Sequence, residues 1–208
     1  MNLCDIGNTS FHFLIKGEEF KYFLNESVPR IEGPVYYISV NETATLKLKH
    51  TYDEIIDLEP YINFQTQYEG MGLDRKVACI GFDNAIIVDA GSAITVDMME
   101  DSKHKGGFIL PGLTKLKEIY PDISIKLDID FNVKVKLDTI PLNTQDAISY
   151  AILKSIIKPI VEIANNKPII FTGGDGEFLS QFVENSTYKK NLLFEHMEGI
   201  INANNCIA

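Results

Sequence analysis

The sequence predicts an α/β protein that is built from two domains of related topology. Strand–turn–strand segments are mixed with helical segments along the chain, as is typical of α/β folds. A short pattern also occurs twice: an apolar strand ends in Asp, followed by x-Gly, by hydroxyl or amide residues and by a returning strand. The two Asp residues, Asp5 and Asp89, lie 84 positions apart. A repeat at this distance indicates two copies of one fold rather than a solenoid.

The composition is that of a globular protein with a substantial core. The chain has 208 residues, of which 45% are hydrophobic, and a formal net charge of −10. Such acidity disfavours general binding to phosphate backbones, so we expect no nucleic-acid partner. No apolar run approaches the roughly 18 residues of a membrane span, and no signal-peptide pattern opens the sequence. The three cysteines lack any CxxC spacing. We therefore expect a cytoplasmic protein without a membrane partner.

The first part of the chain predicts mainly β structure. We expect strands at 3–6, 10–16, 20–24 and 35–40. The run at 35–40 is continuously apolar, which is typical of a parallel strand that is buried on both faces. Asn41 is a suitable cap for a helix that ends near His50. Residues 51–67 predict only a short strand or a loop. We place the end of this first domain at residue 82.

The second domain, 83–208, mixes helices and strands. We expect strands at 85–88, 93–98, 123–137, 167–171 and 191–194. We expect helices over 74–80, which still belongs to the first domain, over 113–119, from Asn143 with an interruption at Pro159, shortly after Gly176, and from Glu198. The segment 106–112 is rich in glycine and predicts a packing turn, because it lacks the lysine of a phosphate-binding P-loop.

The repeated turn has the chemistry of a phosphate site. Gly7 and Gly91 allow the backbone to approach a phosphate closely, and the free N–H groups of a tight turn form an anion-binding nest. A carboxylate at the strand end can hold a metal ion, usually through water. Two such turns that face each other would clamp a triphosphate. An ordinary β-turn explains either copy alone, whereas both copies at strand ends favour a phosphate site.

Several motifs, in order, resemble those of type III pantothenate kinases, a family of the acetate and sugar kinase, heat-shock chaperone and actin superfamily. They are Asp5–Thr9, Gly70–Arg75, Asp89–Thr95, Gly106–Gly112, Asn143–Ala147 and Thr172–Gly174, and together they span nearly the whole chain. The chain departs from the family at Ser92, where Thr is usual, and in a shortened segment between Tyr68 and Gly72.

The resemblance implies two ribonuclease-H-like (actin-like ATPase) domains with the active site in the cleft between them. It implies transfer of the ATP γ-phosphoryl group to the primary hydroxyl of pantothenate, the first step towards coenzyme A. It also implies magnesium bound with ATP, a monovalent cation (potassium or ammonium), and a homodimer.

The resemblance also implies roles for individual residues. The ATP-binding residues would be Asp5, Ile6, Gly7, Asn8, Thr9, Ser10, Phe11, His12 and Ser92. The substrate-binding residues would be Tyr68, Gly72, Leu73, Asp74, Arg75 and Thr144. Asp74 would accept the proton of the pantothenate hydroxyl. Asp89 would bind the monovalent cation, and Asp5 would hold magnesium through water.

Other interpretations stay open at this point. Asp74 followed by Arg75 is also the pattern of a simple helix N-cap. Another small-molecule kinase of the superfamily is a second reading of the motifs, although Gly72–Arg75 argues against it. A third is a non-catalytic accessory regulator on the same fold. The chain has no helix-turn-helix pattern or basic patch for direct contact with DNA.

Overall fold

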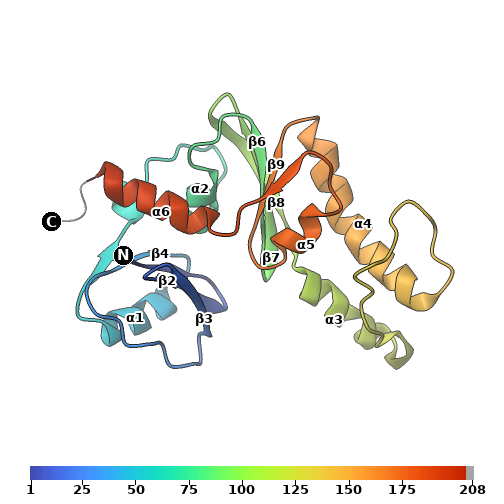
Figure 1. The fold of residues 1–208 in the computed structure, drawn as a ribbon, viewed down its shortest axis with the longest axis horizontal. Coiled ribbons are helices and arrows are strands. Elements are labelled where there is room, and N and C mark those ends of the chain that lie inside the picture. The colour runs from blue at the N-terminus through green and yellow to red at the C-terminus, as the bar shows by residue number, and fades with distance from the viewer. Residues whose placement is uncertain (205–208) are drawn as a thin grey trace. The chain divides into compact units, whose positions relative to one another are not determined.

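The computed structural model describes residues 1–204, which form two compact units (Figure 1). The first unit comprises Met1–Ile80 and the C-terminal segment from Asn191 onward, and the second comprises Gly81–Lys190. Each unit contains one five-stranded sheet. None of the helices in this described part of the chain has the length and apolar character needed to span a bilayer.

The sheet of the first unit begins with an antiparallel meander and continues with parallel strands. Its strands are β1 (Asn2–Ile6), β2 (Ser10–Ile15), β3 (Glu18–Phe23), β4 (Val35–Ser39) and β5 (Ile55–Asp57). Their order is β3-β2-β1-β4-β5, with β4 parallel to both β1 and β5. The helix α1 (Glu42–Thr51) joins β4 to β5, and the Asn41 side chain caps it by accepting from Ala44 N at 3.0 Å. A 3₁₀ turn, η1 (Glu59–Tyr61), follows β5.

Both faces of this sheet are buried. Successive residues of a strand point to opposite faces, so Leu3 and Cys4 enter different cores. The Cys4 face packs against α1 through Leu48. The Leu3 face packs against α2 (Leu73–Cys79) and α6 (Leu192–Ala203). The helix α6 therefore covers the sheet that carries the first predicted phosphate turn.

The second unit repeats this topology. Its strands are β6 (Ala85–Ala90), β7 (Ala93–Glu100), β8 (Lys103–Pro111), β9 (Ile169–Thr172) and β10 (Ser186–Tyr188). Their order, β8-β7-β6-β9-β10 when followed from the β8 edge, matches β3-β2-β1-β4-β5 with the same parallel and antiparallel pairings. The α/β class and the duplicated fold that the repeat predicts are thus confirmed.

The helices of the second unit complete its core. They are α3 (Leu113–Ile123), the 3₁₀ turn η2 (Ile125–Leu127), α4 (Thr144–Ala164) and α5 (Gly176–Ser180). One side of α4 lies on the sheet, where Ile152 and Ile156 pack with Val88 and Phe171. Figure 1 shows α4 as the longest helix of this unit, in orange.

The strand expected at 123–137 is wrong. The helix α3 runs on to Ile123, η2 follows, and the remainder is irregular. Its backbone bonds are local, as between Leu127 N and Ser124 O at 2.8 Å and between Val135 N and Asn132 O at 3.3 Å. The alternating pattern therefore marks an extended segment that anchors Val135 in the core without joining a sheet.

Other predicted elements also differ from the structure. The helix α4 continues through Pro159, although proline has no N–H to donate to the preceding turn. Ile156 and Ile160, on either side of Pro159, are buried in the core and keep both parts of the helix packed on the sheet. Residues 106–111 lie in β8 instead of a turn. The segment 191–194 begins α6 and is not a strand. Because α6 packs on α2, the last helix belongs to the first unit, whereas the sequence placed 83–208 in one domain.

Candidate active site

The first predicted phosphate turn joins β1 to β2. It closes through a hydrogen bond from Gly7 N to Ser10 O at 3.0 Å, and the side chains of Asn8 and Thr9 are exposed. Leu24 N donates to Thr9 O at 3.2 Å and anchors the turn to the end of β3. The turn therefore presents polar side chains to solvent from a backbone that is fixed at both ends.

Asp5 lies one residue before the end of β1 and is half-buried. The register places it opposite His12 on β2 and Ile38 on β4, on the face that α6 covers. The Cys4 thiol beside it has its pKa raised, first by burial and then by the charge of Asp5. This thiol therefore stays protonated, and Asp5 is the group at this strand end that can bind a cation.

Three of the predicted ATP-binding residues have other structural tasks. The side chains of Ile6 and Phe11 are fully buried in the core under α1, so these residues can offer only backbone atoms to a phosphate. His12 Nε2 lies 3.2 Å from Glu19 Oε2, and its ring packs edge-on against Phe194 with centroids 4.8 Å apart.

The second predicted phosphate turn, between β6 and β7, follows the same plan. Gly91 N donates to Ala93 O at 3.0 Å, and Ser92 is exposed at the tip. Asp89 is half-buried and lies opposite Thr95 on β7 and Thr172 on β9. This turn is one residue shorter than the first, because Ala90 pairs with Ile94 whereas Ile6 pairs with Phe11.

Asp74 lies in the first turn of α2. Gly72 is the N-cap residue, and no side chain caps the helix, so the N-cap interpretation of Asp74 is wrong. Asp74 Oδ1 instead accepts a hydrogen bond from Arg75 N at 2.8 Å. A Cβ on Gly72 would lie only 2.5 Å from this oxygen, which shows that the carboxylate folds back over the glycine.

The predicted substrate residues Tyr68 and Arg75 come together in the first unit. The Arg75 side chain is buried, with 5% of the residue exposed, and its guanidinium carbon lies 4.6 Å from the Tyr68 ring centroid. This is cation–π geometry, which restricts the guanidinium to one orientation. Leu73 has its side chain in the core with Val77. Asp74 thus lies between Leu73, which is fixed by the core, and Arg75, which is fixed by stacking on Tyr68.

Thr144 is the first residue of α4 and is exposed. Asn143 caps the helix by accepting from Asp146 N at 2.9 Å, and Asp146 accepts in return from Asn143 Nδ2 at 2.7 Å. Asn132 Nδ2 also donates to Asp146, at 2.6 Å. These hydrogen bonds, with that from Asn132 the larger cause, lower the pKa of Asp146. The reciprocal cap fixes the backbone of Thr144.

Sequence reasoning missed one buried polar pair. His104 Nε2 lies 2.9 Å from Asp97 Oδ1, and their side chains are 0% and 3% exposed. Gly107 pairs with Asp97 across the hairpin, and Met99 pairs with His104. Asp97 shares a sheet face with Thr95 and hence with Asp89. No spacing rule predicts a contact across this bulged hairpin.

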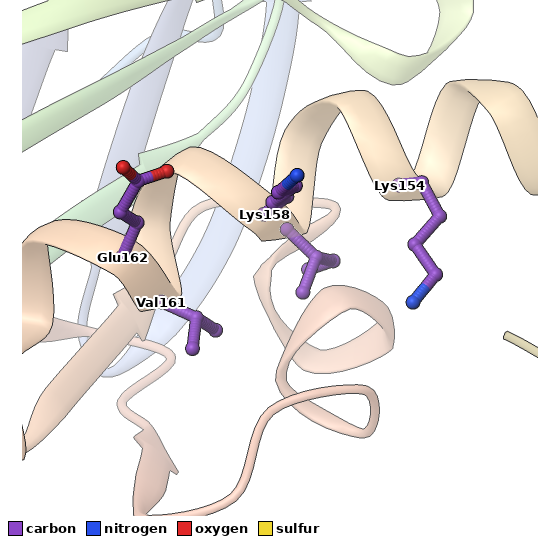
Figure 2. Close-up of a pocket in the computed structure, with 5 residues that line it drawn as sticks. Lys154, Lys158, Val161 and Glu162 are labelled. Carbon is purple, nitrogen blue, oxygen red and sulfur yellow. The ribbon is translucent and has the colours of Figure 1, made fainter. Parts of the chain in front are cut away.

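One hollow in the second unit is lined by none of the predicted site residues. It has a volume of about 500 Å³ and is lined by residues of α4 (Figure 2): Lys154, Ile157, Lys158, Val161 and Glu162. Within residues 1–204, no three His, Cys, Asp or Glu side chains converge as metal ligands. The three predicted carboxylates, Asp5, Asp74 and Asp89, lie at the strand-end turns and at the start of α2.

The fold defines the class of the protein, an α/β protein with two actin-like, ribonuclease-H-like domains of related topology. A solved Sinorhizobium meliloti protein named as a 2-dehydro-3-deoxygalactonokinase has a TM-score of 0.60 to this chain at 9% identity, over 97% of this chain and 98% of its own. At that identity the likeness concerns the fold alone.

The particular family follows from closer relatives. The family model described as "Type III pantothenate kinase" matches residues 34–166. A type III pantothenate kinase of Helicobacter hepaticus is 44% identical over 204 residues, covering 97% of this chain and 98% of the relative. That of Campylobacter hominis is 45% identical over 209 residues, with the same coverage. A solved Campylobacter jejuni structure has a TM-score of 0.87 and 40% identity over 100% of both chains. The chain belongs to the type III pantothenate kinase family.

Proposed function

We propose that this chain transfers the γ-phosphoryl group of ATP to the primary hydroxyl of pantothenate. The product is 4'-phosphopantothenate, and the reaction is the first step of coenzyme A biosynthesis. The observation that carries this proposal is the arrangement at α2, where Asp74 folds over Gly72 beside the buried Arg75, which is stacked on Tyr68. Within a chain of this family, the Asp74 carboxylate can accept from the hydroxyl of pantothenate, and the Arg75 guanidinium can bind the carboxylate of pantothenate.

The chemical step requires orientation more than strong basicity. The hydroxyl oxygen attacks the γ-phosphorus, the bond to the β–γ bridging oxygen breaks, and the hydroxyl proton passes to the Asp74 carboxylate. A carboxylate is a weak base beside an alcohol. In a loose transition state the proton moves late, so Asp74 acts mainly by holding the hydroxyl in line. Arg75, with a planar fork of donors, suits the carboxylate of pantothenate.

The two turns would bind the phosphates of ATP. The exposed Asn8, Thr9 and Ser92 offer polar side chains, and the backbone N–H groups of such turns favour anions. Asp5, half-buried at its strand end, is an oxygen ligand of the type that suits Mg²⁺ and would hold it through water. The bound Mg²⁺ would supply neutralisation of charge on the phosphates.

Asp89 would hold a monovalent cation, potassium or ammonium. Its Oδ1 and the carbonyl oxygen of Ala90 both lie against Gly173, so two oxygen atoms gather at this strand end. Carboxylate and carbonyl oxygens are hard ligands, and they suit K⁺ better than a transition metal. The donor set fits the cation.

We further propose a cytoplasmic homodimer that uses an apolar face of the second unit. Large apolar side chains that are about half or more exposed occur on α3, on η2 and on the segment that leads to α4: Ile119, Ile123, Ile125, Val133, Ile140 and Leu142. Large exposed apolar surfaces are rare on monomers, which favours an interface in this part of the chain. A second copy would cover it, and Thr144 at its border would then serve the substrate site across the interface.

A second candidate is a non-catalytic accessory regulator. The similar Campylobacter jejuni structure bears the name of the Baf family of transcriptional activators. However, curated relatives from the same species, 43% identical to this chain, are named type III pantothenate kinases. The net charge of −10 also disfavours direct contact with DNA.

The proposed function is tested by choice of acceptor. The purified chain is incubated with ATP, Mg²⁺ and K⁺ and with pantothenate, acetate or a hexose, and products are identified by mass spectrometry. We expect a phosphorylated product from pantothenate only. Phosphorylation of acetate or of the sugar would support another kinase of the superfamily, and the absence of any product would support the regulator.

A further inference from the structure

Two glycines hold the turn that carries Asp89 and Ser92. The resemblance placed Gly173, together with Thr172 and Gly174, close to the adenosine of ATP, and it gave Gly112 no role in the site. Gly112 is the N-cap residue of α3, and its N–H donates to Ser92 O at 3.1 Å. Gly173 directly follows β9, where Thr172 pairs with Asp89. All of these residues belong to the second unit, so their contacts are independent of how the units are arranged.

Gly173 lies directly beneath the Asp89 carboxylate. A Cβ at Gly173 would be 2.6 Å from Ala90 O and would overlap Asp89 Oδ1. The backbone φ of Gly173 is +81°, a conformation that L side chains rarely adopt. Both the backbone conformation and the space therefore require glycine here. The carboxylate occupies the place that any other residue's Cβ would take.

Gly112 makes the equivalent contact with the other end of the turn. Its φ of −62° and ψ of 162° are open to every residue, so conformation does not explain this glycine. A Cβ at Gly112 would nevertheless lie 2.6 Å from Ser92 O and would overlap Gly91 O. Gly112 therefore allows the start of α3 to lie close to the turn between β6 and β7.

The first unit shows that the topology alone does not require glycine after the central parallel strand. Ile38 pairs with Asp5 as Thr172 pairs with Asp89, so Ser39 corresponds to Gly173. Ser39 carries a side chain, which accepts from Thr45 Oγ1 at 2.7 Å. The requirement for glycine in the second unit therefore comes from the position of the Asp89 turn itself.

We propose that Gly173 and Gly112 are positioning residues with separate tasks. Gly173 sets the Asp89 carboxylate for the monovalent cation, and Gly112 sets Ser92 for the phosphates of ATP. This inference rests on the proposed function, because it takes the ligands of Asp89 and Ser92 from there.

The test compares Gly173→Ala and Gly112→Ala with Gly33→Ala. Gly33 has a φ of +80° with nothing within 4 Å of its would-be Cβ, so its variant carries the same backbone strain without a clash. Binding is measured by calorimetry without turnover, with Tl⁺ as the probe for the potassium site and ATP with Mg²⁺ as the probe for the turns.

We expect a divided result. Gly173→Ala should weaken Tl⁺ binding by roughly 10- to 100-fold, as is usual when the support of a metal ligand is altered, and should affect ATP less. Gly112→Ala should weaken ATP binding more than Tl⁺ binding. Gly33→Ala should lower the melting temperature and leave both affinities unchanged. Equal losses of both ligands in both variants, or unchanged Tl⁺ binding in Gly173→Ala, would overturn the proposal.

Two further outcomes are decisive. If the unaltered chain binds no Tl⁺, the cation role of Asp89 fails and Gly173 loses its task, whereas Tl⁺ binding that survives Gly173→Ala contradicts this inference alone. If Gly173→Ala does not fold, the double variant Asp89→Ala, Gly173→Ala is prepared, since removing the carboxylate removes its clash. Recovery of folded protein supports the contact with the carboxylate. A double variant that still does not fold shows that Gly173 is required by the Ala90 carbonyl and by its φ of +81° instead, which contradicts a task in setting the carboxylate.

Discussion

At the scale of single residues, Asp74 depends on the glycine before it. Its carboxylate occupies the space that a Cβ on Gly72 would fill, and it accepts from the backbone of Arg75. The Gly-x-Asp-Arg pattern therefore has a steric reason: the residue two positions before the carboxylate must be small for the carboxylate to fold back. The position of the Asp74 carboxylate therefore depends on the backbone at Gly72 and Arg75.

Gly72→Ala tests this dependence. The clash is with the end of a side chain that can rotate away, so we expect an almost unchanged melting temperature. The carboxylate would leave its position, and kcat should fall by about 10- to 100-fold. Steady-state kinetics and a thermal melt check both parts. A full kcat, or a drop in kcat that only follows unfolding, would show that the position of Asp74 does not matter.

Asp74→Asn tests the role of the carboxylate itself. Because the amide cannot accept the hydroxyl proton, kcat should fall by roughly two to four orders of magnitude. The affinity for ATP should be retained, because the proposed ATP ligands lie on the strand-end turns and not on α2. Turnover near that of the unaltered chain would remove Asp74 from the mechanism.

The sequence predicted the position of the three candidate carboxylates in the fold better than it predicted their surroundings. Asp5, Asp74 and Asp89 all lie at the ends or starts of elements, as predicted. Phe11 alternates with Phe13 on one apolar face of its strand, so the pattern predicts its burial, whereas the resemblance placed it among the ATP-binding residues. The tasks of Gly112 and Gly173 depend on backbone contacts between distant segments, which no local pattern encodes.

At the scale of elements, the start of α4 is a self-contained unit of hydrogen bonds. Asp146 accepts from both Asn143 and Asn132 and thereby ties the irregular segment before the helix to its first turn. This network positions Thr144 without touching the core. It also explains the Asn-x-x-Asp spacing of the motif as a capping arrangement.

The network predicts a pH dependence of stability. The pKa of Asp146 is lowered from its ordinary value of 3.8, so its contribution is present above that pH and is lost as pH falls through the lower, folded-state pKa. Asp146→Asn should therefore lower the melting temperature at pH 7, and the difference from the unaltered chain should shrink below pH 3.8. Melting curves at several pH values test this; a constant difference down to acid pH would contradict it.

Element boundaries show where sequence reasoning ends. Asn41 was correctly read as a cap because the cap bond is local. The segment 123–137 alternates as a strand does, yet its bonds are short turns. The start of α6 was placed too late, because its apolar run 191–194 reads equally as a strand. Its helical state is fixed by tertiary packing of Phe194 and Met197 on the first sheet.

At the scale of the whole molecule, the duplication was readable from one short repeat. The two sheets share strand order and pairing although the strands connect through different helices. The sequence could not show that the last helix returns to the first unit, since that depends on packing between α2 and α6, including the 2.7 Å bond between His196 Nδ1 and Val77 O.

Leu142→Glu tests the proposed dimer. Leu142 is 98% exposed, so a charge there should not disturb the fold of one copy, but it would be costly inside an apolar interface. We expect light scattering to give the mass of a dimer for the unaltered chain and of a monomer for the variant. The matched control is Leu46→Glu, on the exposed side of α1, where the residue is 56% exposed and the dimer should persist. A dimer that persists in Leu142→Glu would exclude this face.

The rate of ADP release with and without pantothenate, in potassium and in sodium buffer, tests whether this chain is a pantothenate kinase. We expect ADP release to depend on pantothenate, to be fast in potassium, and to fall when sodium replaces potassium. ADP release that proceeds equally without pantothenate would contradict the assignment as a pantothenate kinase. A rate indifferent to the cation would contradict the role given to Asp89.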